Sequence, residues 1–133
     1  MKEVLSIRNL NKTFESGFKL KDINFDIKEG EVVSLIGESG SGKTSISKII
    51  VALLKAKGQI LFKGMDILEN PKKINGKIQM IFQSPYSSLN PKYKIKDIIL
   101  EGVIYQKVLE KEENIDEYLL NILNEVGLDK EVL

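Results

Sequence analysis

Apolar residues in the first half of the chain predict a β-rich start that leads into a strand, a loop and a helix. Apolar positions in Val4–Ile7 and Phe18–Ile27 partly alternate with polar ones, which is typical of half-buried strands. The run Val32–Ile36 is apolar at all but one position, as in a strand covered on both faces of a parallel sheet. Apolar residues at helical spacing then predict a helix over Gly42–Leu54.

The second half continues with strands and closes with helices. The pattern predicts strands at Gln59–Phe62, after a break at Gly58, and at Ile78–Phe82. Helices are expected over about Lys96–Leu109 and Ile115–Val126. Turns are expected at Ser16-Gly17, Glu29-Gly30-Glu31 and Lys63-Gly64, and Gly127 is expected to cap the last helix.

Composition restricts the function classes. The 133 residues are 42% hydrophobic and 29% charged, which suits one globular domain. A net charge of +1 argues against a general nucleic-acid partner, which would need a basic excess. With no Cys and no His, thiolate metal sites and Ser-His-Asp hydrolysis are excluded. No apolar run approaches the roughly 20 residues of a membrane span, and the start of the chain does not look like a signal peptide, so we expect a cytoplasmic protein without direct membrane insertion.

One motif carries chemistry. Residues 37–44 read GESGSGKT, a full match to G-x-x-x-x-G-K-[ST] between a strand signal and a helix signal. In such a loop, backbone N–H groups point inward and make an anion site, and the helix that follows adds the positive end of its dipole. Lysine can reach the β and γ phosphates, and threonine can ligate Mg²⁺. We therefore expect ATP to bind at Gly37, Glu38, Ser39, Gly40, Ser41, Gly42, Lys43, Thr44 and Ser45.

Two segments resemble a known family. GEVVSLIGESGSGKTSISKII resembles the Walker A region of ABC-transporter ATPases, and IQMIFQSPYSSLNPKYKIKDIILEG resembles the Q-loop region of the same family. The string FQSPYSSLNP looks like the subfamily that imports oligopeptides, dipeptides and nickel. The resemblance covers the whole chain and implies an α/β fold, that of an ABC-type nucleotide-binding domain of the P-loop NTPases. It implies an antiparallel β part at 1–30, a P-loop core at 31–94 and the start of a helical subdomain at 95–133.

The resemblance also implies roles for single residues. Lys43 and Gln83 would be catalytic, and Thr44 and Gln83 would contact Mg²⁺. Phe14 lies where the family places an aromatic residue that stacks on adenine, with Phe18 as a nearby competitor. The loop Tyr86–Pro91 is either a contact for a membrane subunit or a simple proline-bounded turn.

The family's later motifs are missing from the sequence. There is no LSGGQ-like signature, no apolar run ending in Asp-Glu and no switch histidine. We therefore expect a truncated ATPase domain that binds ATP but hydrolyses little or none alone. In the family that the chain resembles, the strand at Val32–Ile36 pairs with the Walker B strand. Without that neighbour, it would have an open apolar edge, which predicts self-association or a rearranged sheet.

The resemblance, together with the phosphate loop, implies the ATPase subunit of a peptide or metal-ion importer. Its partners would be transmembrane permease subunits and a second, identical or different, ATPase domain, at the inner face of the cell membrane. Two alternatives remain open: a non-catalytic nucleotide-binding interaction module, and a P-loop kinase or GTPase.

Overall fold

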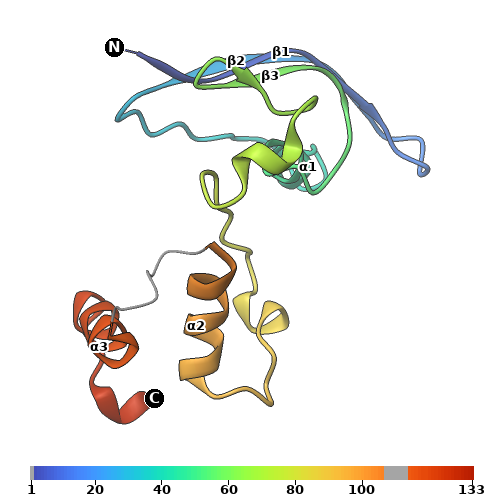
Figure 1. Cartoon of the computed structure of the whole chain (residues 1–133). Coiled ribbons are helices and arrows are strands. Elements are labelled where there is room, and N and C mark those ends of the chain that lie inside the picture. Colours follow the sequence, from blue (N-terminus) through green and yellow to red (C-terminus); the bar gives the residue numbers. More distant parts are fainter. Residues whose placement is uncertain (1, 107–113) are drawn as a thin grey trace. The chain divides into compact units, whose positions relative to one another are not determined.

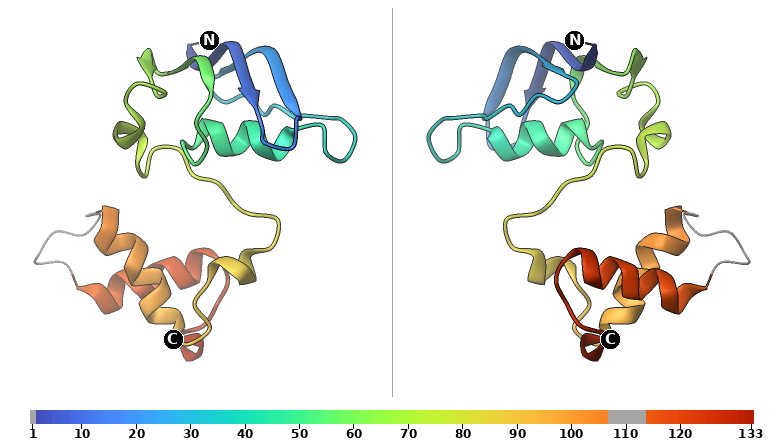
Figure 2. Two further views of the ribbon diagram at one scale, coloured as in Figure 1. Left: turned by 90° about the vertical axis from the view of Figure 1, so that its right-hand side faces the viewer. Right: turned by 90° about the vertical axis from the view of Figure 1, so that its left-hand side faces the viewer.

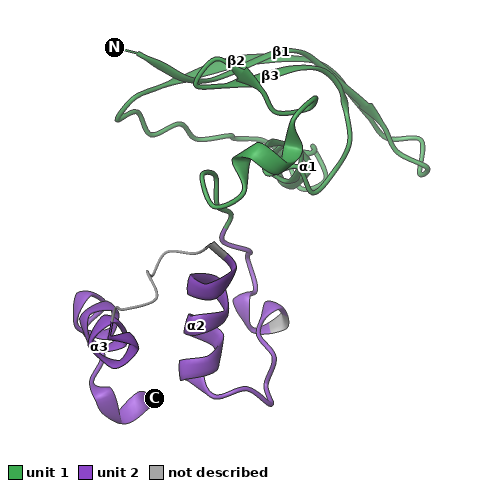
Figure 3. Cartoon of the chain, in the orientation of Figure 1, with its two compact units in different colours: residues 1–80 green, residues 81–133 purple. Residues whose placement is uncertain are grey.

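The computed structural model describes residues 2–106 and 114–133, apart from the side chain of Ser87. The chain divides into two compact units, residues 1–80 and 81–133 (Figure 3). The first unit contains a β-sheet and one α-helix, and two α-helices are described in the second. The predicted division at residues 30 and 94 stays a prediction.

The first unit is built on an antiparallel sheet (Figure 1) of four strands, β1 (Glu3–Thr13), β2 (Lys19–Lys28), β3 (Lys57–Phe62) and β4 (Met65–Asp66). Their order in the sheet is β2-β1-β3-β4. In the central strand β1, Leu5 lies opposite Ile27 of β2 and also opposite Phe62 of β3. The predicted strands near the N-terminus and before Lys63 are thereby confirmed, although β1 is longer than expected.

Turns join these strands where the sequence predicts them. The N–H of Gly17 donates to the carbonyl of Phe14 at 2.9 Å, and Lys63 and Gly64 have φ angles of 50° and 83°. Gly58 lies inside β3 rather than before it. Its φ is +120°, and a Cβ there would come within 2.4 Å of the Asn9 carbonyl oxygen, so this glycine lets β1 approach closely.

Helix α1 (Lys43–Ile50) packs against one face of the sheet, as the views in Figures 1 and 2 agree. The helix is shorter than predicted because Ala52 has a left-handed φ of 59° and its N–H donates to Ile49 at 3.0 Å. The 3-10 helix η1 (Pro71–Ile74) adds one more buried side chain. The core contains Leu5, Ile7, Leu10, Leu20, Ile46, Ile49, Ile60, Phe62, Ile67 and Ile74.

Two predicted strands are wrong. Residues 32–36 and 78–82 form no strand, and within the described ranges no strand pairs with either run. Val32 and Ile36 are 93% and 95% exposed, and Ile81 is 93% exposed. An apolar run indicates a tendency to be buried, but a strand exists only where a neighbour satisfies its backbone N–H and C=O groups. Here the apolar pattern is present without that neighbour.

The second unit contains the 3-10 helices η2 (Pro85–Ser88) and η3 (Lys130–Val132) and the helices α2 (Ile95–Gln106) and α3 (Ile115–Glu125). The predicted extension of α2 to Leu109, and the charged stretch 110–113, lie outside the described residues. Among the described residues of the second unit, the buried apolar side chains are those of Val103, Leu119 and Leu123.

Both ends of α3 carry caps. The Asn114 Oδ1 accepts from the N–H groups of Asp116 and Glu117, which satisfies two donors of the first turn. At the other end Gly127 has a φ of 73°, and the next residue, Leu128, donates to the Leu123 carbonyl at 2.9 Å. Gly127 is thus the predicted C-terminal cap, in a Schellman motif.

Candidate phosphate-binding site

The side chain of Lys43 lies inside the GESGSGKT loop. Its Nζ donates to the carbonyl oxygens of Gly37 and Glu38 at 2.7 and 2.6 Å, and to the Oγ of Ser41 at 3.2 Å. An ammonium group has three donors, so all of them are used. These bonds keep the loop wrapped around the Lys43 ammonium. A bound anion can accept a hydrogen bond from the Lys43 ammonium only if at least one of these three bonds is broken.

Glycines give this loop its shape. Gly40 and Gly42 have φ angles of 81° and 98°, which residues with a Cβ rarely adopt. At Gly37 the reason is closeness instead, because a Cβ would lie 2.9 Å from the Ser41 Oγ. The left-handed backbone therefore explains Gly40 and Gly42, and close approach explains Gly37.

Helix α1 begins inside the motif. Its first intrahelical bond runs from the N–H of Ile46 to the carbonyl of Gly42 at 2.9 Å. No side chain among the described residues caps this end. The N–H groups of Lys43, Thr44 and Ser45 belong to the first turn, whose amides find no partner within a helix. These amides, together with the helix dipole, are a ready site for an anion.

The same turn offers a ligand for a cation that accompanies a phosphate. Thr44 is exposed at the N-terminus of α1, next to the free amides. The described part of the chain contains no group of three or more acidic side chains that could hold a metal by themselves. Mg²⁺ that arrives with a nucleotide keeps several waters and takes oxygens from the phosphates, so a single hydroxyl such as that of Thr44 suits it.

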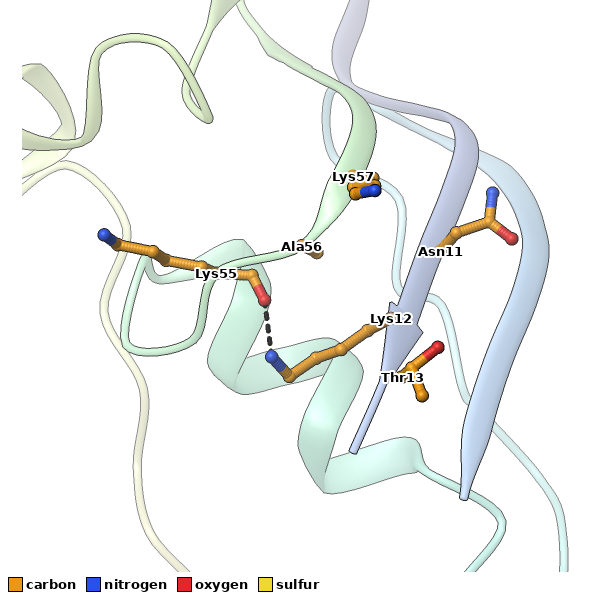
Figure 4. A pocket seen from close by; sticks show the side chains of 6 residues that line it. All are labelled: Asn11, Lys12, Thr13, Lys55, Ala56 and Lys57. Atoms are coloured by element: carbon orange, nitrogen blue, oxygen red, sulfur yellow. Dashed lines mark hydrogen bonds between the residues drawn. The ribbon is translucent and has the colours of Figure 1, made fainter. Parts of the chain in front are cut away.

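Phe14, the predicted adenine contact, is half-buried and packs against the core of the first unit. Lys12 covers its ring, with the Nζ 5.0 Å from the ring centroid. That ammonium donates to the carbonyl of Lys55 at 2.7 Å, on the wall of a hollow of about 440 Å³. Figure 4 shows Lys12 reaching toward this carbonyl, while the side chain of Lys55 points away. The hollow is lined by Asn11, Lys12, Thr13, Lys55, Ala56 and Lys57, with no residue of the phosphate loop.

The remaining predicted site residues belong to the second unit. Gln83 is exposed in an irregular segment, and its predicted contacts with Mg²⁺ stay a prediction. Tyr86 and Leu89 are exposed on and just after η2, so the predicted loop Tyr86–Pro91 presents apolar side chains to solvent.

The sequence did not single out two contacts of the loop. Gly42 lies against the side chains of Phe18 and Leu20. A Cβ at this glycine would come within 2.4 Å of Leu20 Cδ2. Only Phe18 could have been suspected, from its closeness in sequence to Phe14. A contact between β2 and the start of α1 depends on the packing of the first unit, which no local pattern encodes.

A glycine-rich loop that closes around a lysine and opens directly into a helix defines the class of P-loop nucleotide-binding proteins. The comparisons with known proteins give the family. The ABC transporter family matches residues 20–133, and this chain therefore belongs to it. The ATP-binding cassette fold is confirmed, in part, by solved structures, and membership of the family implies ATP binding.

Among curated relatives, the oligopeptide transport ATP-binding protein OppF of Streptococcus mutans is 38% identical over 142 residues. The dipeptide transport ATP-binding protein DppF of Lactococcus lactis is 37% identical over 144 residues. Each alignment covers 99% of this chain and 46% of the relative, so the chain spans about half the length of these proteins. The resemblance to the peptide-importer subfamily is confirmed.

Two solved structures share the fold. The cbiO1 protein of Clostridium perfringens, part of the ABC transporter complex cbiONQ, matches with a TM-score of 0.76 and 27% identity, over 99% of this chain and 53% of that one. The ADP conformation of MJ1267, an ATP-binding cassette of an ABC transporter, matches with a TM-score of 0.70 and 28% identity, over 96% and 55%. Among the helices that the structure describes, none is long and apolar enough to cross a membrane.

Proposed function

We propose that this chain is the nucleotide-binding part of an ATPase subunit that energises the import of peptides or metal ions. The observation that carries the proposal is the Lys43 ammonium seated inside the GESGSGKT loop, next to the free amides of α1. The names of the relatives support the transport role, because OppF and DppF are ATP-binding proteins of oligopeptide and dipeptide transport.

In this proposal the triphosphate binds over the start of α1. The amides of Gly40 and of Gly42 to Ser45 donate to phosphate oxygens, and the Lys43 ammonium exchanges a loop carbonyl for a β or γ phosphate oxygen. The Thr44 hydroxyl would be a ligand for Mg²⁺, which would neutralise phosphate charge, and Gln83 keeps its predicted role toward the ion or the attacking water. A carboxamide suits that role because it can both accept and donate hydrogen bonds without a change of charge.

The proposed partners are transmembrane permease subunits and a second ATPase domain, at the cytoplasmic face of a membrane. Exposed apolar side chains of Tyr86 and Leu89 support a role for the loop Tyr86–Pro91 in contacting a membrane subunit. The chain does not need nucleic acid in this scheme, in keeping with its net charge of +1.

Calorimetric titration with Mg²⁺-ATP tests the proposal. We expect saturable binding to the wild type and at least a tenfold loss of affinity for Lys43→Ala, since a charge-assisted phosphate contact is worth about 1.5–3 kcal/mol. Lys72→Ala is the matched control, because Lys72 is an exposed lysine of η1 in the same unit. Equal affinities in all three proteins, or no binding to the wild type, would refute the proposal.

A further inference from the structure

The chain makes a tight turn at Asn75 and Gly76, directly after η1. Asn75 has a φ of −51° and a ψ of 126°, and Gly76 has a φ of 74°. The Lys77 N–H donates to the Ile74 carbonyl at 2.9 Å, which closes the turn. These angles define a type II turn, whose third position needs a positive φ and therefore favours glycine. Both central residues are exposed, so an asparagine is held in solvent next to a glycine amide.

Asn75 is the only asparagine of the chain that precedes a glycine. The sequence has nine asparagines, of which Asn70 and Asn90 precede prolines and the other six precede residues with larger side chains than glycine. A proline nitrogen carries no hydrogen and cannot act as a nucleophile after losing one. The nitrogen of Gly76 is the least hindered of these backbone amides, because its residue has no side chain to shield it.

Neither group of this pair is occupied by another contact. Among the hydrogen bonds of the described residues, none involves the Gly76 N–H or the Asn75 carboxamide. By contrast, the exposed Asn90 accepts from the Lys92 N–H at 3.1 Å, and Asn114 caps α3. The Gly76 nitrogen approaches the Asn75 side chain when the peptide between the two residues rotates, and glycine permits that rotation.

We propose that Asn75 and Gly76 form a site of spontaneous deamidation, with water as the other reactant. The Gly76 nitrogen loses its proton to solvent base and attacks the Cγ of Asn75. The N–Cγ bond forms, the Cγ–Nδ2 bond breaks, and ammonia leaves with a proton. Water then opens the resulting five-membered imide at one of its two ring C–N bonds, which leaves aspartate or isoaspartate at position 75. No oxidant or reductant enters this balance, and the step does not depend on nucleotide binding.

The modification changes both the charge and the main chain of this segment. The segment 71–77 contains three lysines, all exposed, and no acidic residue. A new carboxylate among these ammonium groups is electrostatically favoured, and it lowers the formal net charge of the chain from +1 to zero. Isoaspartate also adds one carbon to the main chain between the buried Ile74 and Ile78, which packs against the core. The segment is thereby changed from a basic turn to a less basic one with a longer backbone.

Ageing the 133-residue protein in a mildly alkaline buffer tests the proposal. Cleavage after glutamate releases the peptide 70–101, which contains Asn70, Asn75 and Asn90. Fragment masses assign any gain of one mass unit, the exchange of an amide NH₂ for OH, to one of these asparagines. We expect the gain at Asn75 alone, with one ammonia released per modified chain. The isoaspartate fraction should accept a labelled methyl group from S-adenosylmethionine when an isoaspartyl methyltransferase is added.

Two variants test the assignment. Asn75→Gln keeps a carboxamide, but ring closure would need six atoms instead of five, so the mass gain and the methyl acceptance should be lost over the period in which the wild type reacts. Asn90→Gln is the matched control, because Asn90 is exposed but precedes a proline, and it should age as the wild type does. Circular dichroism checks that each variant is folded.

A further comparison separates the folded turn from the bare sequence. The peptide 70–101, released from fresh protein and aged by itself, reacts without the fold. We expect the folded protein to react within about tenfold of this peptide, because only one hydrogen bond closes the turn. A mass gain in the free peptide with none in the folded protein would overturn the inference, since the fold would then protect the pair. Equal gains at Asn75 and Asn90, or equal ageing of the wild type and Asn75→Gln, would overturn it as well.

Discussion

The glycines at positions 40 and 42 have similar backbone angles but different surroundings. Around Gly40 a Cβ would meet nothing within 4 Å, whereas at Gly42 it would meet the side chains of Leu20 and Phe18. Strain from the left-handed backbone thus acts at both positions, and steric overlap acts only at Gly42.

Alanine at each glycine therefore separates the two effects. Both variants should lose about 1–2 kcal/mol of unfolding free energy from backbone strain, and Gly42→Ala should lose about 1–3 kcal/mol more from overpacking. Urea unfolding of the two proteins measures the difference. Equal destabilisation would mean that the contact of Gly42 with β2 has no energetic weight.

A second pair of residues links β1 and β2 through charge. Asp26 Oδ2 accepts from Arg8 Nη2 at 2.8 Å, and Asp26 Oδ1 accepts from the Oγ of the buried Ser6 at 2.8 Å. Arg8 Nη1 lies 2.6 Å from Asp26 Oδ1. The Arg8 guanidinium, followed by the Ser6 hydroxyl, lowers the pKa of Asp26, and Asp26 raises the pKa of Arg8. Both shifts favour the charged forms in the folded state.

This pair predicts a pH dependence of stability. Because the folded pKa of Asp26 lies below the unfolded value of about 3.9, its stabilisation is full well above that pH and is lost as pH falls through the folded pKa. Asp26→Asn should therefore lower the melting temperature at pH 7, and the difference from the wild type should shrink in acid. Glu15→Gln, at an exposed turn residue, is the control. A constant difference between pH 7 and pH 2.5 would contradict this account.

At the scale of elements, the open question is the apolar run at residues 32–36. It lies between β2 and the phosphate loop without a strand partner in the described residues, and Val32 and Ile36 are almost fully exposed. An extended apolar segment with open backbone groups is a template for pairing with another chain.

We therefore expect the 133-residue chain to self-associate with rising concentration, as light scattering would show. Val32→Asp should weaken this association, because a charge on the run disfavours its burial. Leu53→Asp, at another exposed apolar residue of the same unit, should leave it unchanged. A wild type that stays strictly monomeric at high concentration would refute the prediction.

Local patterns predicted most of the elements and most of the loop. Strands β1, β2 and β3 and helices α2 and α3 follow from spacing and turn residues, as does the cap at Gly127. The runs 32–36 and 78–82 were misjudged because periodicity reports a tendency toward burial, and says nothing of whether a partner strand is present. The end of α1 at Ile50 was missed because it depends on the left-handed Ala52.

The candidate site shows the same division. The motif alone predicted the anion site, the glycine positions and the lysine, since each depends on the chemistry of one short run of consecutive residues. The contact of Phe18 with Gly42, and that of Lys12 with the Lys55 carbonyl, each join residues that are far apart in sequence. Contacts of that kind need the packed unit.

For the chain as a whole, we predict that ATP binding occurs without turnover. The sequence has the phosphate loop but no signature motif and no apolar run ending in Asp-Glu. Turnover, unlike binding, needs a side chain that positions and polarises the attacking water. We expect ATP binding with phosphate release near the background rate. Sustained phosphate release that Lys43→Ala abolishes would contradict this expectation.

The most direct test of the central claim follows the backbone amides of the loop by nuclear magnetic resonance during a titration with Mg²⁺-ATP. The account predicts that the amide signals of Gly40 and of Gly42 to Ser45 move together and saturate with one dissociation constant. It is contradicted if ATP binds while those signals stay in place, because the nucleotide would then be held somewhere other than the loop that closes around Lys43.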